Sequence, residues 1–227
     1  RLVSYVLRRA KRRTIGLTID HRGLRVGAPA RASLREVESL ILKHGEWVTE
    51  KLDEWRTPQR PELLEIRDGL RLPLLGVPLE IRFSAGGNRV FWHSENETTP
   101  QTLTLCLRSL PDAPGVLEKA LRDKARGLFT ERLAYYAKQL GVAPPLLTLS
   151  AARTRWGSCS LQTGIRLNWR LIHFPPQVID YVVAHELAHL REMNHSPRFW
   201  AVVGLLYPAY KTARADLKQL ATTCPRW

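Results

Sequence analysis

Alternating apolar positions predict a small sheet at the start of the chain. Ile15, Leu17 and Ile19 alternate with small or polar residues, as a strand with one buried face requires. An apolar run over residues 2–7 precedes this strand, and residues 24–26 form a returning strand after a turn. The pattern therefore predicts that the chain begins with short, half-buried strands.

Helical periodicity begins near residue 33 and predicts one helix that continues to Trp55. Ser33 and Glu36 have the spacing of a capping box, in which each side chain accepts a hydrogen bond from the other residue's backbone N–H. The apolar stripe of this helix consists of Leu34, Val37, Leu40, Ile41, Val48 and Leu52. Further strands are predicted between Gly, Pro and Asn residues, at 70–75, 79–83, 89–92 and 103–107.

A second region of helical periodicity covers residues 114–140. Its apolar residues recur at helical spacing, and Gly141 ends the pattern. Strands are then predicted at 147–150 and 165–171, and two more helices complete the chain. Helices and strands that are not regularly alternated predict an α+β fold.

The change from short strands to a long helix predicts a domain boundary. The boundary is expected within 109–114, where Pro and small residues separate the two patterns. We therefore expect a β-rich N-terminal domain with one helix at 1–110 and a second domain at 111–227.

The chain is strongly basic, which affects the choice of partners. Its 227 residues include 35 Lys and Arg against 21 Asp and Glu, a formal net charge of +14. Such a surface attracts polyanions, so contact with nucleic acid or nucleotides stands beside the simpler interpretation of an inert basic surface. We interpret the basic run over 8–13 as protection of an exposed strand edge.

The cysteines and the apolar runs indicate the setting of the protein. Cys106, Cys159 and Cys224 are odd in number and far apart, so neither a disulfide framework nor a cysteine-rich zinc ribbon is indicated. No apolar run approaches the roughly 18 residues needed to cross a bilayer. We expect reduced thiols, a cytoplasmic location and no membrane contact, whereas the oligomeric state is not predicted.

The segment His185-Glu186-Leu187-Ala188-His189 carries the clearest chemistry. Pro175-Pro176 favours a helix start, and no helix breaker occurs from 177 to 193. On a helix, His185 and His189 lie about 40° apart and one turn from each other, so one ion can bind a nitrogen of each. Glu186 lies about 100° round the helix, where it can take a proton from an ion-activated water without being a ligand.

A pair of solvated histidines on a helix surface is the alternative interpretation. The helix is apolar nearly all round, so it should be buried, and buried imidazoles need polar or metal partners. The residues that give it this character are Val178, Ile179, Val182, Val183 and Leu187. The sequence therefore favours a metal site.

His195 is predicted to be the third ligand, because catalytic zinc usually has three protein ligands. On an unbroken helix it would lie about 15 Å beyond His185, out of reach. Asn194 tolerates the left-handed conformation that ends helices, and Ser196-Pro197 has the pattern of an N-cap followed by the first residue of a new helix. His195 thus lies in a turn that can fold it back toward the pair.

The ordered motifs of the second half resemble those of the YgjP-like metal-dependent hydrolases. These motifs are Arg155-Trp156-Gly157-Ser158-Cys159, Asn168-Trp169-Arg170-Leu171, the histidine segment, Asn194-His195-Ser196 and Phe199-Trp200. That family is related to the SprT-like and WLM metallopeptidase domains of the zincin superfamily. The resemblance is strong over 145–215 and looser in the N-terminal half. It implies a zincin-like C-terminal domain, the ligands His185, His189 and His195, and the general base Glu186.

The spacing of the three histidines also matches that of metzincin proteases, but other features differ. Glu192 stands where those proteins have a Gly, and no Met-turn is evident. Membership of that group is therefore not indicated.

These observations predict a zinc-dependent hydrolase, and the resemblance implies a peptide or protein substrate. An edge strand at 165–171 could align an extended peptide by main-chain hydrogen bonds. One alternative keeps the metal but makes the substrate a nucleotide or another phosphate compound, since the chain is rich in arginine. A second alternative is a nucleic-acid-associated protein with a structural zinc ion.

Several other polar residues near the motifs are not predicted to be catalytic. Cys159 is interpreted as a structural thiol, and Asn168 as a polar partner of a turn. Arg153 and Arg155 suit anionic groups as well as surface pairing, and Tyr207 and Tyr210 suit core packing better than oxyanion binding.

Overall fold

The computed structural model describes residues 3–12, 14–20, 22–56, 63–93 and 101–227. The chain contains two compact units, Arg1–Glu62 and Leu63–Trp227. Helices and strands occur in both units, so the expected α+β class is confirmed. None of the described helices combines the length and the apolar content required to span a membrane.

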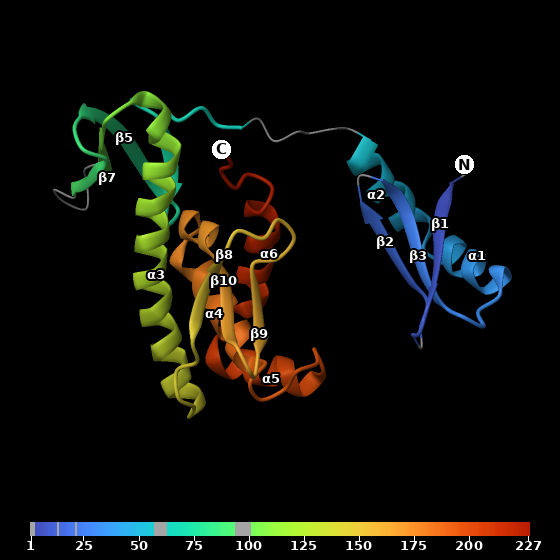
Figure 1. Cartoon of the computed structure of the whole chain (residues 1–227). Coiled ribbons are helices and arrows are strands. Elements are labelled where there is room, and N and C mark those ends of the chain that lie inside the picture. Colours follow the sequence, from blue (N-terminus) through green and yellow to red (C-terminus); the bar gives the residue numbers. More distant parts are fainter. Residues whose placement is uncertain (1–2, 13, 21, 57–62, 94–100) are drawn as a thin grey trace. The chain divides into compact units, whose positions relative to one another are not determined.

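The first unit is a three-stranded sheet with two helices against one face (Figure 1). Its strands are β1 (Tyr5–Ala10), β2 (Gly16–Asp20) and β3 (Gly23–Pro29), in the order β1-β3-β2. β3 pairs with β1 in parallel and with β2 antiparallel. Side chains alternate between faces, so Leu24, Val26 and Ala28 all point into the core of this unit.

The helix expected up to Trp55 is in fact two helices, α1 (Leu34–Lys43) and α2 (Gly45–Arg56). The predicted capping box is present, with the Ser33 N–H 2.7 Å from the Glu36 carboxylate. The chain leaves helical geometry at His44, just before a glycine. On one continuous helix Val37 and Val48 would lie about 16 Å apart. The break between α1 and α2 lets both valines pack on a sheet that is only three strands wide.

The second unit begins with a four-stranded sheet in the order β4-β5-β7-β6. Its strands are β4 (Arg71–Leu74), β5 (Val77–Ala85), β6 (Arg89–His93) and β7 (Gln101–Leu107), close to the four predicted segments. A short 3₁₀ turn, η1 (Leu110–Asp112), leads into helix α3 (Ala113–Leu140), as predicted for 114–140. α3 runs past both sheets of this unit (Figure 1).

The division of the chain falls between residues 62 and 63, whereas the sequence suggested one near residue 110. The four-stranded sheet belongs to the same core as α3, because Ile81 and Leu105 are buried in one cluster with Leu117 and Leu121. A composition change at 109–114 marks a turn within this core, not its end.

The remaining elements form a second sheet and a layer of helices. The strands β8 (Leu147–Ser150), β9 (Gly157–Ser160) and β10 (Gly164–Asn168) have the order β8-β10-β9. A 3₁₀ segment, η2 (Trp169–His173), and the helices α4 (Pro176–Ala188), α5 (Pro197–Leu206) and α6 (Tyr210–Leu220) follow.

The expectation of an edge strand at 165–171 is wrong in two respects. The strand ends at Asn168, whose side-chain oxygen accepts a hydrogen bond from the Arg170 N–H and caps η2. β10 also lies in the middle of the sheet, with β8 on one side and β9 on the other. Among the described strands, β9 therefore forms an edge of this sheet.

Candidate metal centre

Helix α4 holds the first two histidines in the core of the second unit. Val178, Val182 and Leu187 are buried on it, which confirms that the helix is covered nearly all round. It ends earlier than expected, at Ala188, and His189 is its C-cap residue in helical geometry. The two imidazole rings nevertheless lie one turn apart, with centroids separated by 5.2 Å.

A turn after α4 brings the third histidine back to the pair. The turn is closed by backbone bonds from Leu190, Arg191 and Glu192 to carbonyls at the end of α4. Asn194 plays no left-handed role, because Leu75 and Asn88 are the non-glycine residues with positive φ in the described part of the chain. The helix thus stops through tight turns, not through the left-handed residue that the sequence suggested.

His195 completes a cluster of three imidazoles. Its Nε2 lies 3.2 Å from Nε2 of His185, and one nitrogen of each histidine lies within 4.8 Å of the others. Ser196 caps α5 as predicted, since its Oγ accepts a hydrogen bond of 3.3 Å from the Phe199 N–H. Tetrahedral coordination at metal–nitrogen distances near 2.0 Å requires nitrogen separations of this order.

Aromatic side chains of α5 and α6 fix the orientation of the histidines. The Phe199 ring lies 4.6 to 4.9 Å from all three imidazoles, and Trp200 stacks on His195 with centroids 5.8 Å apart. Tyr210 in turn stacks on Trp200 at 5.5 Å. The ring of His195, which is exposed, therefore owes its orientation to an aromatic stack and not to burial.

The electrostatics of the cluster suit a metal ion. Burial, followed by the neighbouring His189, His195 and Arg214, lowers the pKa of His185 to about 4. Burial also lowers the pKa of His189, whose Nδ1 lies 3.2 Å from the Glu192 carbonyl oxygen. A neutral imidazole whose Nδ1 donates to a carbonyl, as in His189, leaves Nε2 free as a metal ligand. The donor set therefore fits zinc.

Glu186 is buried beside the histidines, with 6% of its surface exposed. Desolvation raises the pKa of its carboxyl group to about 7. A carboxyl group with this pKa is able both to accept and to release a proton near neutral pH.

Gly157 on β9 lies directly against the carboxylate of Glu186. A Cβ atom added at this glycine would stand 2.6 Å from Cγ and Cδ of Glu186, and nearer still to Oε1. The sequence suggested only a backbone bend here, because a contact across 29 residues leaves no local pattern. Gly157 is therefore the site residue that sequence reasoning missed.

The other polar residues singled out in the sequence do not join the histidine cluster. The Asn168 amide donates to the carbonyls of Ala152 and Arg155, at 2.8 and 3.3 Å, which confirms its role as the polar partner of a turn. Burial and the Glu186 charge raise the pKa of the Cys159 thiol, which is not one of the converging groups. Burial, followed by the charges of Asp180 and Asp216, raises the pKa of the Tyr207 hydroxyl, and this side chain packs against the core, as expected.

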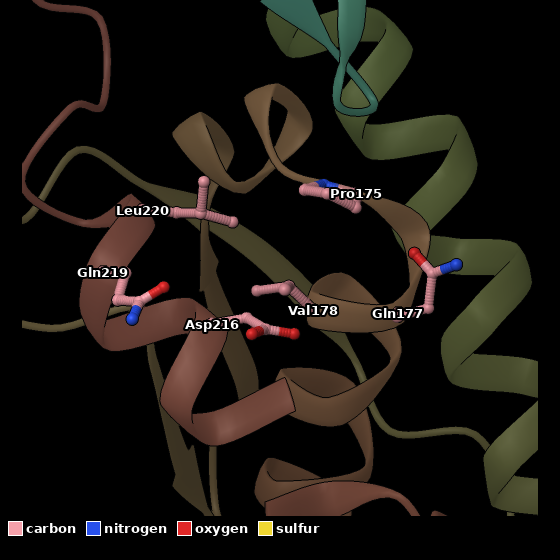
Figure 2. A pocket seen from close by; sticks show the side chains of 6 residues that line it. All are labelled: Pro175, Gln177, Val178, Asp216, Gln219 and Leu220. Carbon is pink, nitrogen blue, oxygen red and sulfur yellow. The ribbon is translucent and has the colours of Figure 1, made fainter. Parts of the chain in front are cut away.

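The cleft in Figure 2 is at the opposite end of α4 from the histidines. It has a volume of about 300 Å³ and lies between the start of α4 and the end of α6. Its lining consists of Pro175, Gln177, Val178, Asp216, Gln219 and Leu220. It is thus separate from the candidate metal centre.

Comparison with known families places the chain in the metallopeptidase class. More particularly, the sequence model of the YgjP-like metallopeptidase domain matches residues 13–220, and the chain belongs to this family. No curated protein matches the chain.

The solved structures that are similar to part of the chain include two metallopeptidase zymogens. One is the zymogen of the metallopeptidase abylysin of Pyrococcus abyssi, with 24% identity and a TM-score of 0.38 over 43% of this chain and 96% of that one. The other is the zymogen of jannalysin of Methanocaldococcus jannaschii, with 18% identity and a TM-score of 0.36 over 42% and 96%.

Proposed function

We propose that the chain is a zinc-dependent metallopeptidase in which His185, His189 and His195 hold the ion and Glu186 is the general base. One observation carries the proposal: three imidazole nitrogens from separate turns converge within 4.8 Å beside a buried carboxyl group. Solvated surface histidines would have no reason to converge in this way.

Glu186 performs the proton transfers in the proposed reaction. When bound, zinc lowers the pKa of water toward about 7 and polarises the substrate carbonyl. The Glu186 carboxylate takes the proton of the attacking water and delivers it to the leaving amine. Gly157 leaves the carboxylate room to lie in its buried position, and the low polarity there keeps its pKa close to the working range.

The edge strand β9 is the proposed docking strand for an extended peptide. It includes Gly157, so a peptide paired with it would pass close to Glu186. β10 already pairs with the β9 backbone on one side. Main-chain hydrogen bonds along the open side would align a substrate with little regard to sequence.

A phosphate-containing substrate is retained as a second candidate because of Arg214. This side chain stacks over Trp200 at 4.9 Å and acts electrostatically on His185, so it adds positive charge beside the cluster. Arginine binds phosphate oxygens with matched geometry. A purely structural zinc ion is less favoured, because three histidine ligands leave one coordination position open.

Metal content and hydrolysis, measured together, test the proposal. The parent, His189→Ala and Glu186→Gln are loaded with zinc, freed of excess and assayed by elemental analysis, then incubated with a peptide mixture and with nucleotides. We expect about one zinc per chain in the parent and in Glu186→Gln, little in His189→Ala, and peptide cleavage by the parent alone.

Two outcomes contradict the proposal. A parent that binds no zinc rules out the site, and a Glu186→Gln variant with full activity rules out the role of this residue. If the parent hydrolyses nucleotides but cleaves no peptide, a phosphate compound replaces a peptide as the proposed substrate.

A further inference from the structure

The first unit separates its charges between its two layers. The helical layer, residues 34–53, has more acidic than basic residues: Glu36, Glu38, Glu46, Glu50 and Asp53 against Arg35, Lys43 and Lys51. The described sheet layer, residues 5–29, has one acidic residue, Asp20, against Arg8, Arg9, Lys11, Arg12, Arg22 and Arg25. The excess positive charge of this unit is thus concentrated on the sheet.

One face of this sheet is open. Leu7 on β1 and Leu17 on β2 pack toward the helices. Their neighbours along each strand therefore point to the opposite face of the sheet, and Val6 is 61% exposed there. We call this second surface the open face; it contains Val6, Arg8, Ala10, Gly16, Thr18, Asp20, Arg25 and Gly27.

Glycines make the centre of the open face flat. Arg8 is in register with Gly27, and Gly27 is in register with Gly16. The guanidinium of Arg12 lies over both glycines: a Cβ atom at Gly16 would stand 2.8 Å from Nη2 of Arg12, and one at Gly27 would overlap Nη1. Side chains at these positions would displace the guanidinium from the sheet.

The arginines of this unit divide into engaged and available ones. Arg9 points to the helical side and donates to the carbonyls of Pro29, Ala30 and Ala32, so it stabilises the loop before α1. Arg25 pairs with Asp20 at 3.5 Å. Arg8 and Arg12 are exposed, and neither has an acidic partner within the described ranges. Edge protection alone does not account for two such arginines on a face.

We propose that the open face binds the backbone of single-stranded nucleic acid through Arg8 and Arg12. Guanidinium groups match phosphate oxygens in geometry, and their planes also stack on unpaired bases. A flat sheet surface around Gly16 and Gly27 offers neither a helix nor a two-stranded ribbon that projects into a duplex groove, which disfavours recognition of a paired sequence. A flat, basic sheet suits an exposed strand whose phosphates and bases are both accessible.

An anionic membrane surface suits the open face less well. Stable adsorption to lipid requires apolar or aromatic side chains that enter the interface, in addition to positive charge. Val6 is an exposed large apolar residue of this face, and Tyr5 points to the helices, where its hydroxyl donates to Glu38.

Fluorescence anisotropy of the full zinc-loaded chain with labelled oligo(U) and oligo(dT) tests this inference. The variant Arg8→Ala/Arg12→Ala is compared with Arg35→Ala/Lys43→Ala, which removes the same charge from the helical layer. We expect binding by the first variant to be roughly tenfold weaker at 0.1 M salt, with a salt slope smaller by about 1.4, and less than about a twofold change for the second.

The folding of both variants is checked by circular dichroism and thermal unfolding. Equal weakening of both would show diffuse attraction by the net charge and overturn the proposal, as would a parent that binds neither oligonucleotide. Tighter binding to a duplex, or binding to phosphatidylserine vesicles but not to oligonucleotides, would also overturn it. Peptidase activity is independent of this result, so a failure here leaves the metal centre untouched.

Discussion

At the scale of single residues, the proposed site depends on the close approach of Gly157 to Glu186 and on the stack of Trp200 on His195. Gly157 permits the buried position of Glu186, and Trp200 orients the exposed His195. In the proposed site neither residue is a ligand or the base, so each would act by positioning a group that has one of these roles. Replacement of Gly157 should therefore affect turnover, whereas replacement of Trp200 should affect metal affinity.

Replacement of Gly157 by Ala is expected to reduce turnover while zinc stays bound. The new Cβ would lie within the van der Waals radius of Glu186, so the buried carboxylate must move. Misplacement of a catalytic group by about 1 Å costs on the order of a hundredfold in rate. Peptide turnover and zinc content are to be measured for Gly157→Ala beside Gly87→Ala, where an added Cβ meets nothing within 4 Å. Unchanged turnover in Gly157→Ala would contradict the arrangement.

Replacement of Trp200 by Ala is expected to weaken zinc binding without abolishing it. The stack of His195 on Trp200 is lost, so the third ligand must be ordered when the ion binds. Groups that orient a ligand contribute roughly tenfold to a hundredfold in affinity. Competition with a chelator measures the zinc affinity, with Leu205→Ala as a control on the same helix because Leu205 is 76% exposed. Equal affinities in the two variants would show that Trp200 does not position His195.

At the scale of elements, η2 joins the two sheets of the second unit. The N–H groups of Leu75 and Gly76 donate to the carbonyls of Ile172 and His173, at 2.8 and 3.2 Å. The buried His173 adds a contact of 2.6 Å between its Nδ1 and the Pro73 carbonyl oxygen. The connection between the β4–β5 hairpin and the layer that contains the histidines thus includes a titratable group.

His173 should make the stability of the chain sensitive to acid. Burial lowers the pKa of its imidazole to about 4, from 6.5 in the unfolded chain. Its neutral form is favoured by folding, so the contribution is complete above pH 6.5 and is lost as the pH falls toward 4, by up to about 3 kcal/mol.

Urea unfolding of the metal-free chain at pH 7.5 and 4.5 measures this contribution. The difference between the two pH values should be smaller in His173→Gln than in the parent, whereas the exposed His44→Gln should leave it unchanged. An undiminished difference in His173→Gln would show that other groups cause the acid sensitivity.

The sequence predicts elements and local motifs well, because these depend on periodicity and on neighbours in the chain. The bounds of α3, the caps at Ser33 and Ser196, and the convergence of His195 on α4 followed from such patterns. The contact of Gly157 with Glu186 and the central place of β10 depend on the pairing of distant segments. The periodicity and spacing of residues along the chain do not indicate which distant segments pair. The Gly157–Glu186 contact and the place of β10 could therefore be found only in the structure.

At the scale of the whole molecule, the two units have separate cores. The core of the first unit comprises residues between Leu24 and Val48, and that of the second begins at Leu72. The family match over 13–220 nevertheless includes parts of both units, with β2 and β3 of the first unit among them.

A fragment of residues 63–227 is therefore expected to fold and to bind about one zinc ion per chain. A fragment of residues 111–227 should not, because it lacks the sheet whose Leu79, Ile81, Leu103 and Leu105 cover the apolar side of α3. Removing them exposes several large side chains, each contributing about 1.5 to 3 kcal/mol when buried. Such a loss is of the order of the whole stability of a domain.

Solubility, cooperative thermal unfolding and zinc content of the two fragments decide between the two boundaries. A soluble, cooperatively folded 111–227 fragment with bound zinc would restore the boundary near residue 110 that the sequence suggested. If only 63–227 folds, the β4–β7 sheet is part of the catalytic unit, and oligonucleotide binding should be lost from this fragment with the first unit. Retention of that binding by 63–227 would place the nucleic-acid surface outside the open face.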